Sequence, residues 1–108
     1  MDTSKFNDEV YEVVNLIPEG RVTAYGAIAK ALGYGTARMV GHAMSVMDHH
    51  QKTTPAHRVV NSSGHISAPD SGGGRWRAEM LEKEGIEVKN GKVVKFRELF
   101  WDPSTEII

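Results

Sequence analysis

The side chains best suited to chemistry gather in one short segment. From Pro55 to Gly64 the chain reads Pro-Ala-His-Arg-Val-Val-Asn-Ser-Ser-Gly, which brings an imidazole, a guanidinium and two hydroxyl groups close together in sequence. Ser62 and Ser63 can donate to phosphate oxygens, although a Ser-Ser-Gly run is also an ordinary turn. Ala56 has no lone pair, and the chain contains no cysteine, so thiolate nucleophiles and disulfides are excluded. An enzyme would therefore have to use another group, such as His57.

Two further patterns resemble functional motifs but are incomplete. His49 and His50 are adjacent, so they cannot easily face one metal ion together, and no cysteine or nearby group of acids completes a site. The run Gly72-Gly73-Gly74 is not followed by Lys and Ser or Thr at the spacing of a phosphate-binding loop. We therefore predict no metal and no cofactor, and we expect a solvated loop around the two histidines.

Positive charge is concentrated in the middle of the chain. The 108 residues have a net charge of −1, and 40% hydrophobic with 25% charged residues suits one globular domain over residues 1–108. Residues 1–19 have a net charge of −4, residues 20–78 of +5 and residues 79–108 of −2. Phosphate contacts need local positive charge rather than a basic total, so the middle segment favours a nucleic-acid partner. Chance clustering is the alternative.

No membrane partner is expected from the sequence. The segment from Met1 to Lys5 lacks the charged and apolar regions of a signal peptide. No apolar run approaches the roughly 20 residues that span a bilayer. The absence of cysteine also fits a reducing compartment.

The pattern predicts a mainly helical domain with a small β-hairpin. Apolar residues recur at helical spacing near the start, and capping residues or glycines bound the other helices. Glu87–Val94 is typical of a hairpin around an Asn-Gly turn. Phe100 and Trp101 are expected to attach the tail to the core. The predicted helices are Lys5–Ile17, Ala24–Leu32 with Thr23 as cap, Ala37–Met47 with Thr36 as cap, and Arg75–Glu84.

The second and third predicted helices form a helix-turn-helix pattern. They are joined by Gly33-Tyr34-Gly35. Many such patterns in small helical proteins are only packed helix pairs. A regulator that reads DNA sequence is another possibility. Against it, the third helix offers only Arg38 and His42 as long or ring donors, whereas direct readout generally uses several base-contacting groups.

Four separate segments resemble the O6-alkylguanine-DNA alkyltransferases, in the same order along the chain. Pro18 to Ala29 resembles the segment leading into the first DNA-binding helix, and Thr36 to Met44 resembles the recognition helix. Pro55 to Gly64 resembles the active-site signature, and Leu81 to Gly85 the segment after the lesion loop. The signature has Cys where this chain has Ala56. The chain is therefore similar to the non-catalytic, alkyltransferase-like members, although most of these carry Trp at that position.

The resemblance implies a single winged-helix or helix-turn-helix-like domain, as in the C-terminal domain of the alkyltransferases. Arg38 matches the arginine that enters the duplex through the minor groove, where a planar, charged guanidinium can replace an extruded base. Tyr25 matches the tyrosine that helps to rotate the nucleotide out, and Gly41 a small residue where helix and groove lie close. Without the resemblance these would be a surface arginine, a core tyrosine and a helix-packing glycine. The implied DNA-binding set is Tyr25, Ala37, Arg38, Gly41, Ser62 and Ser63.

The resemblance also implies a pocket for the damaged base. The main-chain carbonyls of Ala56 and Val59 would accept from the guanine amino group, and Ser71 would donate to its O6 edge. Exchange of Cys for Ala leaves space beside O6, where a carbon-lined gap favours alkyl groups by about 0.8 kcal/mol per methylene. His57 and Glu84 match the pair that activates the cysteine, and here they would form only a polar network. The implied pocket is Tyr25, Met44, Ala56, His57, Val59, Pro69 and Ser71.

We therefore expect a non-enzymatic protein that binds double-stranded DNA containing O6-alkylguanine, flips the base into a pocket and leaves the alkyl group in place. The resemblance adds nucleotide excision repair proteins as partners. We also expect a monomer, located with the DNA in a bacterial cytoplasm or a eukaryotic nucleus. Two alternatives stay open: a methyltransferase domain inactivated by a Cys-to-Ala replacement, and a helix-turn-helix transcriptional regulator.

Overall fold

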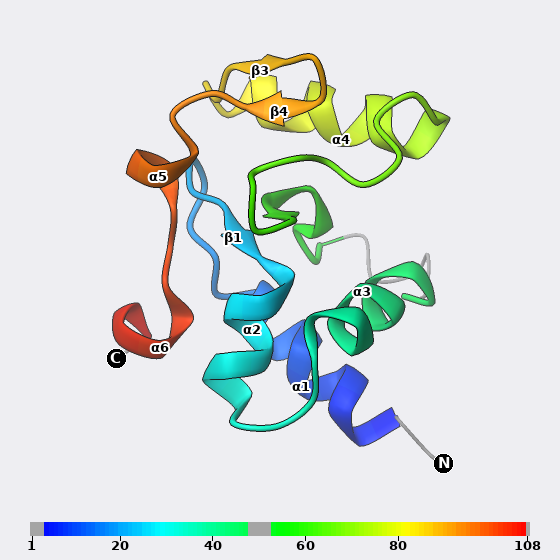
Figure 1. The fold of residues 1–108 in the computed structure, drawn as a ribbon, viewed down its shortest axis with the longest axis vertical. Helices are drawn as coiled ribbons and strands as arrows, with labels where there is room; N and C mark the ends of the chain where they lie inside the picture. Colours follow the sequence, from blue (N-terminus) through cyan, green and yellow to red (C-terminus); the bar gives the residue numbers. More distant parts are fainter. Residues whose placement is uncertain (1–3, 48–52, 108) are drawn as a thin grey trace.

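The computed structural model describes residues 4–47 and 53–107 and is mainly helical, as predicted. Figure 1 shows three N-terminal helices in one half of the molecule and the β3–β4 hairpin with α4 in the other. The expected loop around His49 and His50 lies outside the described residues. None of the described helices is long and apolar enough to cross a membrane. The elements are α1 (Ser4–Val14), β1 (Thr23–Ala24), α2 (Tyr25–Leu32), α3 (Ala37–Ser45), a 3-10 turn η1 (Ala56–Arg58), β2 (Val59–Val60), α4 (Gly72–Lys83), β3 (Val88–Lys89), β4 (Lys92–Val93), α5 (Phe96–Leu99) and α6 (Pro103–Glu106).

The predicted helix-turn-helix is formed by α2 and α3. Gly33 ends α2 with a φ of 82°, a left-handed conformation that glycine adopts without a steric cost. Thr36 caps α3 by accepting a hydrogen bond from the main-chain N–H of Met39. The prediction of Thr23 as the cap of α2 was wrong. Thr23 lies in β1 and is fully buried, and Ala24 is the N-cap without a side-chain hydrogen bond.

Two helices end earlier than their apolar spacing predicted. After Val14 the chain tightens, because the N–H groups of Leu16 and Ile17 bond to carbonyls three residues back at 3.0 and 3.1 Å. Ile17 is still only 2% exposed, so the predicted apolar face is correct although α1 is shorter. The third helix ends at Ser45, whose hydroxyl donates to the His42 carbonyl.

A parallel pair of short strands, which the sequence did not predict, ties the first half of the chain to the signature segment. Thr23 pairs with Val59 and Ala24 with Val60. These pairs place the start of α2 directly beside the end of η1. The position of Ala56 relative to Tyr25 is therefore set by this small sheet.

Helix α4 begins at Gly72, three residues before its predicted start. The hydroxyl of Ser71 accepts from the N–H of Gly74 at 3.0 Å, so a serine cap starts the helix within the glycine run that precedes Arg75. A Cβ on Gly74 would lie 2.1 Å from the Ala68 carbonyl oxygen, so only glycine fits there. The glycines thus allow the 68–71 loop to pack closely on the helix.

The core consists of two clusters, one on each side of the β1–β2 pair. Helices α1, α2 and α3 bury residues including Phe6, Val10, Ile28 and Val40. The second cluster joins Val22, Leu81 and Val93 beneath α4 and the hairpin. The tail is attached as predicted by Trp101, which is 3% exposed and donates its main-chain N–H to the Val22 carbonyl. Phe100 instead packs edge to face on Phe96, with ring centroids 5.7 Å apart.

The predicted hairpin is confirmed. Val88 pairs with Val93 and Lys89 with Lys92 in antiparallel register. Asn90 and Gly91 both have positive φ angles, 52° and 76°, which is the conformation that an Asn-Gly hairpin turn requires. Helices α5 and α6, which follow the hairpin, were not predicted.

Candidate nucleic-acid interface

A surface cavity of about 540 Å³ collects most of the predicted site residues. Helix α3 forms one wall, the start of α2 and η1 form others, and two residues from the 67–77 region close it. The cavity is lined by Tyr25, Ala37, Arg38, Gly41, Met44, Ser45, Ala56, Ser67 and Arg77. Six of the sequence-predicted residues therefore meet in one place although their positions in the chain span Tyr25 to Ala56.

Helix α3 presents one polar and small-residue face to this cavity. Residues 37, 38, 44 and 45 are each three or four positions from Gly41, so all five lie on the same side of the helix. The opposite side buries Val40 and Ala43 completely in the core. Arg38 is exposed and lies in the first turn, where the Thr36 cap fixes the start of the helix. The guanidinium can therefore extend from a rigid element.

Gly41 is not required by packing within the protein. A Cβ built on this residue meets no atom within 4 Å, so close helix packing does not explain the glycine. A glycine in a helix costs about 1 kcal/mol relative to alanine. Its absence of a side chain leaves the surface of α3 open beside Arg38, where a ligand can approach the helix backbone.

Tyr25 holds the far wall of the cavity through a contact that the sequence did not reveal. Its hydroxyl lies 3.0 Å from the hydroxyl of Ser67, and Arg77 donates to the Ser67 carbonyl. Ser67 and Arg77 were not predicted as site residues. Arg77 could be noticed only as part of the basic middle segment, because no local pattern links α4 to the start of α2.

Ala56 contributes only a methyl group to the cavity. It begins η1, and its carbonyl accepts the N–H of Val59. A carbonyl has a second lone pair, so this oxygen can still accept from a ligand. The side chain of Val59 is 2% exposed and points into the core, so only its main chain can serve the predicted role.

His57 and Glu84 form the predicted polar network between the signature segment and α4. The Nε2 atom of His57 lies 2.5 Å from Glu84 Oε2, and Arg58 donates to both carboxylate oxygens at 2.8 to 3.0 Å. Arg58 also donates to the Ile17 carbonyl, and the Gly20 N–H donates to Glu84. The network thus joins η1, α4 and the turn after α1. His57 is 5% exposed and does not line the cavity.

The carboxyl group of Glu84 is held strongly in its charged form. Burial alone would raise its pKa, but the hydrogen bonds from Arg58, the Gly20 N–H and His57 lower the pKa from 4.5 to about 2. The side chain of Glu84 is only 8% exposed. The negative charge of Glu84 therefore stabilises the fold, and it faces Arg58 rather than the cavity.

Pro69 and Ser71 do not lie at the cavity. Pro69 packs beside Gly91 of the hairpin turn. The Ser71 hydroxyl accepts from Gly74 and donates to the Ala68 carbonyl at 2.7 Å, so its hydrogen is already engaged. The glycine-rich start of α4 directs both residues toward the helix and hairpin.

Ser62 and Ser63 lie on an exposed turn away from the cavity. The Asn61 side chain accepts from the N–H groups of Ser63 and His65, both at 2.9 Å, and Gly64 has a φ of 87°. Among residues 4–47 and 53–107, neither serine hydroxyl has a hydrogen-bond partner. Both hydroxyls are therefore available to a ligand.

A helix-turn-helix and a cavity lined by Arg38 and Ala56 are the features of the alkyltransferase-like class of DNA-binding proteins that the sequence predicted. Residues 5–86 match the family model for the 6-O-methylguanine DNA methyltransferase DNA-binding domain, and the chain belongs to this family. Alkyltransferase-like protein 1 of Schizosaccharomyces pombe is 38% identical over 95% of this chain and 100% of its own length. The DNA base-flipping protein of Vibrio parahaemolyticus is 39% identical over 92% of this chain and 98% of its own.

Solved structures lead to the same branch of the family. The crystal structure of S. pombe Atl1 in complex with damaged DNA containing O6-carboxymethylguanine matches with a TM-score of 0.82 and 37% identity, covering 94% of this chain and 98% of the other. The predicted likeness to alkyltransferase-like proteins is confirmed. With Ala56 in the signature and no cysteine in the chain, this protein cannot accept an alkyl group on a thiolate.

Proposed function

We propose that this protein binds double-stranded DNA containing O6-alkylguanine and holds the flipped base in the cavity beside Ala56 without removing the alkyl group. One observation carries the proposal: Arg38, Tyr25 and Ala56 come from three separate elements and line the same cavity. A relative carries the name DNA base-flipping protein, and another is solved with O6-carboxymethylguanine in DNA. Both support this assignment.

The order of events follows from the positions of these residues. The open surface at Gly41 allows α3 to approach a groove, and the exposed Arg38 then fills the place that the extruded base leaves in the stack. Tyr25 and Met44 supply apolar walls for the flipped base. The methyl group of Ala56 borders the alkyl substituent and offers no lone pair for attack. The lesion is therefore held and not repaired.

The first test compares binding to an O6-methylguanine duplex and to its undamaged twin. We expect the wild-type protein to bind the damaged duplex more tightly. In Arg38→Ala the ratio of the two affinities should fall about tenfold, which corresponds to about 1.4 kcal/mol. Arg75→Ala is the matched control, because Arg75 is an exposed helical arginine outside the cavity, and its side chain bonds within residues 4–47 and 53–107 only to the Asp70 carbonyl. Mass spectrometry of the recovered DNA should find the methyl group in place.

Three results would contradict the proposal. Equal affinity for the two duplexes would show that the protein does not recognise the lesion. Demethylated DNA would indicate an enzyme. Preference for one base sequence regardless of damage would indicate a regulator.

The downstream role is also a proposal. We infer that the bound protein acts as a monomer that flags the lesion for nucleotide excision repair, in the compartment that holds the DNA. The absence of a nucleophile supports this, because a lesion that is held but not repaired needs another activity to remove it. Reconstituted excision on an O6-alkylguanine duplex should be faster with the protein present. Unchanged excision, or light scattering that shows a dimer, would count against it.

A further inference from the structure

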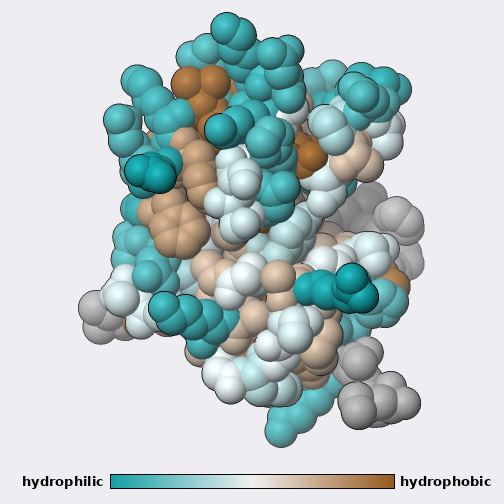
Figure 2. Space-filling model, viewed as in Figure 1, coloured by the Kyte–Doolittle hydropathy of each residue, from teal (hydrophilic) through white to brown (hydrophobic). Residues whose placement is uncertain are grey.

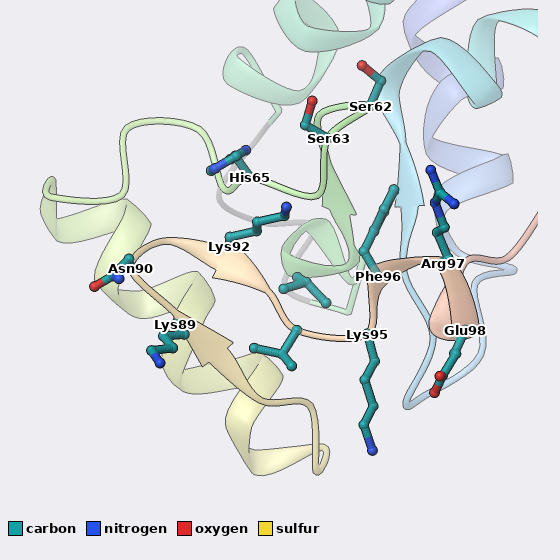
Figure 3. A pocket seen from close by; sticks show the side chains of 12 residues that line it. Ser62, Ser63, His65, Lys89, Asn90, Lys92, Lys95, Phe96, Arg97 and Glu98 are labelled. Carbon is teal, nitrogen blue, oxygen red and sulfur yellow. The ribbon is translucent and has the colours of Figure 1, made fainter.

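A second, larger hollow of about 850 Å³ lies between the turn at residues 61–65, the hairpin and α5. Figure 3 shows Ser62 and Ser63 at one edge, with Arg97 and Lys92 directed toward this turn from α5 and β4. Lys89 and Lys95 also line the hollow, but Figure 3 shows their side chains pointing away from the turn. We call the side formed by Ser62, Ser63, Lys92 and Arg97 the basic groove.

The cations of the basic groove are free. Lys92 and Arg97 are both exposed, and neither has an ion pair or a side-chain hydrogen bond among residues 4–47 and 53–107. The one carboxylate that lines the hollow, Glu98, points away from the turn in Figure 3. The groove therefore presents two cations and two hydroxyls without partners in the described residues, and the cations come from residues 79–108, whose net charge is negative.

The groove is connected to the neighbourhood of the cavity beside Ala56 by a third hollow. Between them lies a mostly apolar hollow of about 420 Å³ that shares Ser62, Phe96 and Arg97 with the larger one. Its other wall includes Gly26, where a Cβ would lie 3.8 Å from the Cβ of Ala37, which lines the cavity. One surface thus runs from α3 along α2 to the 61–65 turn and ends at Lys92. Figure 2 shows pale and apolar residues in the middle of this view and hydrophilic ones toward the hairpin.

We propose that the basic groove binds backbone phosphates of the duplex to one side of the flipped base. This inference rests on the proposed function only for the identity of the duplex. Arg and Lys neutralise phosphate charge, and hydroxyls donate to phosphate oxygens, without reading base sequence. An acidic protein segment would also be attracted, but the free serine hydroxyls and the connection to the cavity favour DNA. The groove supplies affinity, and the cavity supplies selection.

The test compares two double variants that remove the same charge. Lys92→Gln/Arg97→Gln removes the cations that face the turn, and Lys89→Gln/Lys95→Gln removes two that point away. Binding to a duplex of about 20 base pairs, two helical turns, is measured over a range of salt concentrations. The slope of log affinity against log salt is negative, and the first variant should make it less steep by about 1.8, since each lost phosphate contact contributes about 0.9. The control should keep the wild-type slope.

The preference for damaged over undamaged DNA should remain unchanged in Lys92→Gln/Arg97→Gln. This separates the groove from the proposed function, which fails if the wild-type protein itself has no such preference. Equal slopes for both double variants, or a wild-type slope for the first, would overturn the inference. Loss of binding to polyglutamate with DNA binding intact would assign the groove to an acidic protein instead.

Discussion

The cavity beside Ala56 and the basic groove belong to one surface but are built in opposite ways. The segment that carries Ala56 is anchored by hydrogen bonds that join Arg58, Glu84 and His57, and the charge of Arg58 is paired with that of Glu84. The cations of the groove, Lys92 and Arg97, have no partner in the described part of the chain. A site that selects by shape needs its walls fixed, whereas a site that attracts by charge needs its charges unpaired.

The strongest test of this difference is removal of the buried carboxylate. Glu84→Ala leaves the largely buried Arg58 guanidinium and the Gly20 N–H without their acceptor, so it should lower the free energy of unfolding by about 3–5 kcal/mol in urea denaturation. Glu82→Ala, an exposed acid on the same helix, should cost less than about 0.5 kcal/mol. The groove variant Lys92→Gln/Arg97→Gln should behave like this control. Wild-type stability in Glu84→Ala would show that the network does not anchor the cavity wall.

Acid should reveal the same network without any mutation. The pKa of Glu84 is lowered from 4.5 to about 2, so its stabilising contribution is complete above pH 4.5 and is lost as the pH falls toward 2. The shift corresponds to about 3 kcal/mol. Urea midpoints followed from about pH 6 to about pH 2 should show this loss in the wild type. If Glu84→Ala loses the same amount over that range, another group is responsible.

The smallest expected effect is at Gly41, and it separates folding from binding. Because a Cβ there meets nothing within 4 Å, Gly41→Ala should raise the free energy of unfolding by about 0.5–1 kcal/mol. The same methyl group should weaken binding to damaged and undamaged duplexes alike, since it stands on the open face of α3. Gly41→Ala should keep the wild-type slope of log affinity against log salt, unlike Lys92→Gln/Arg97→Gln. If the Gly41→Ala variant is more stable and binds DNA with wild-type affinity, the proposal that α3 closely approaches a DNA groove is contradicted.

Local signals predicted the helical half of the fold well. The Thr36 cap, the Gly33 end of α2 and the Asn90-Gly91 turn all depend on residues adjacent in sequence, and all are confirmed. The β1–β2 pair was missed because two-residue strands carry no periodicity and their partners are distant in the chain. The glycines at the start of α4 lie outside the predicted helix, because their close fit against Ala68 depends on tertiary packing.

The candidate site was predicted where a family motif marked it and missed elsewhere. Tyr25, Arg38 and Ala56 lie together as expected, whereas Pro69 and Ser71 were placed at the cavity and in fact lie against the hairpin and at the start of α4. Ser67 and Arg77 were missed because they meet Tyr25 only through the folded chain.

The sequence alone determined that no bond to an alkyl group can form through a thiolate, because the chemistry of a side chain belongs to its own atoms. It also determined the helix-turn-helix, whose caps and turns act over a few residues. Only the tertiary structure decided which charged side chains form ion pairs and which stay exposed for a ligand. Glu84 and Arg58 neutralise each other across 26 positions, while Lys92 and Arg97, from a segment with a net negative charge, line one hollow with Ser62 and have no ion-pair partner in the part of the chain that the structure describes. Electrostatic interactions depend on distance in space, which the order of residues does not fix.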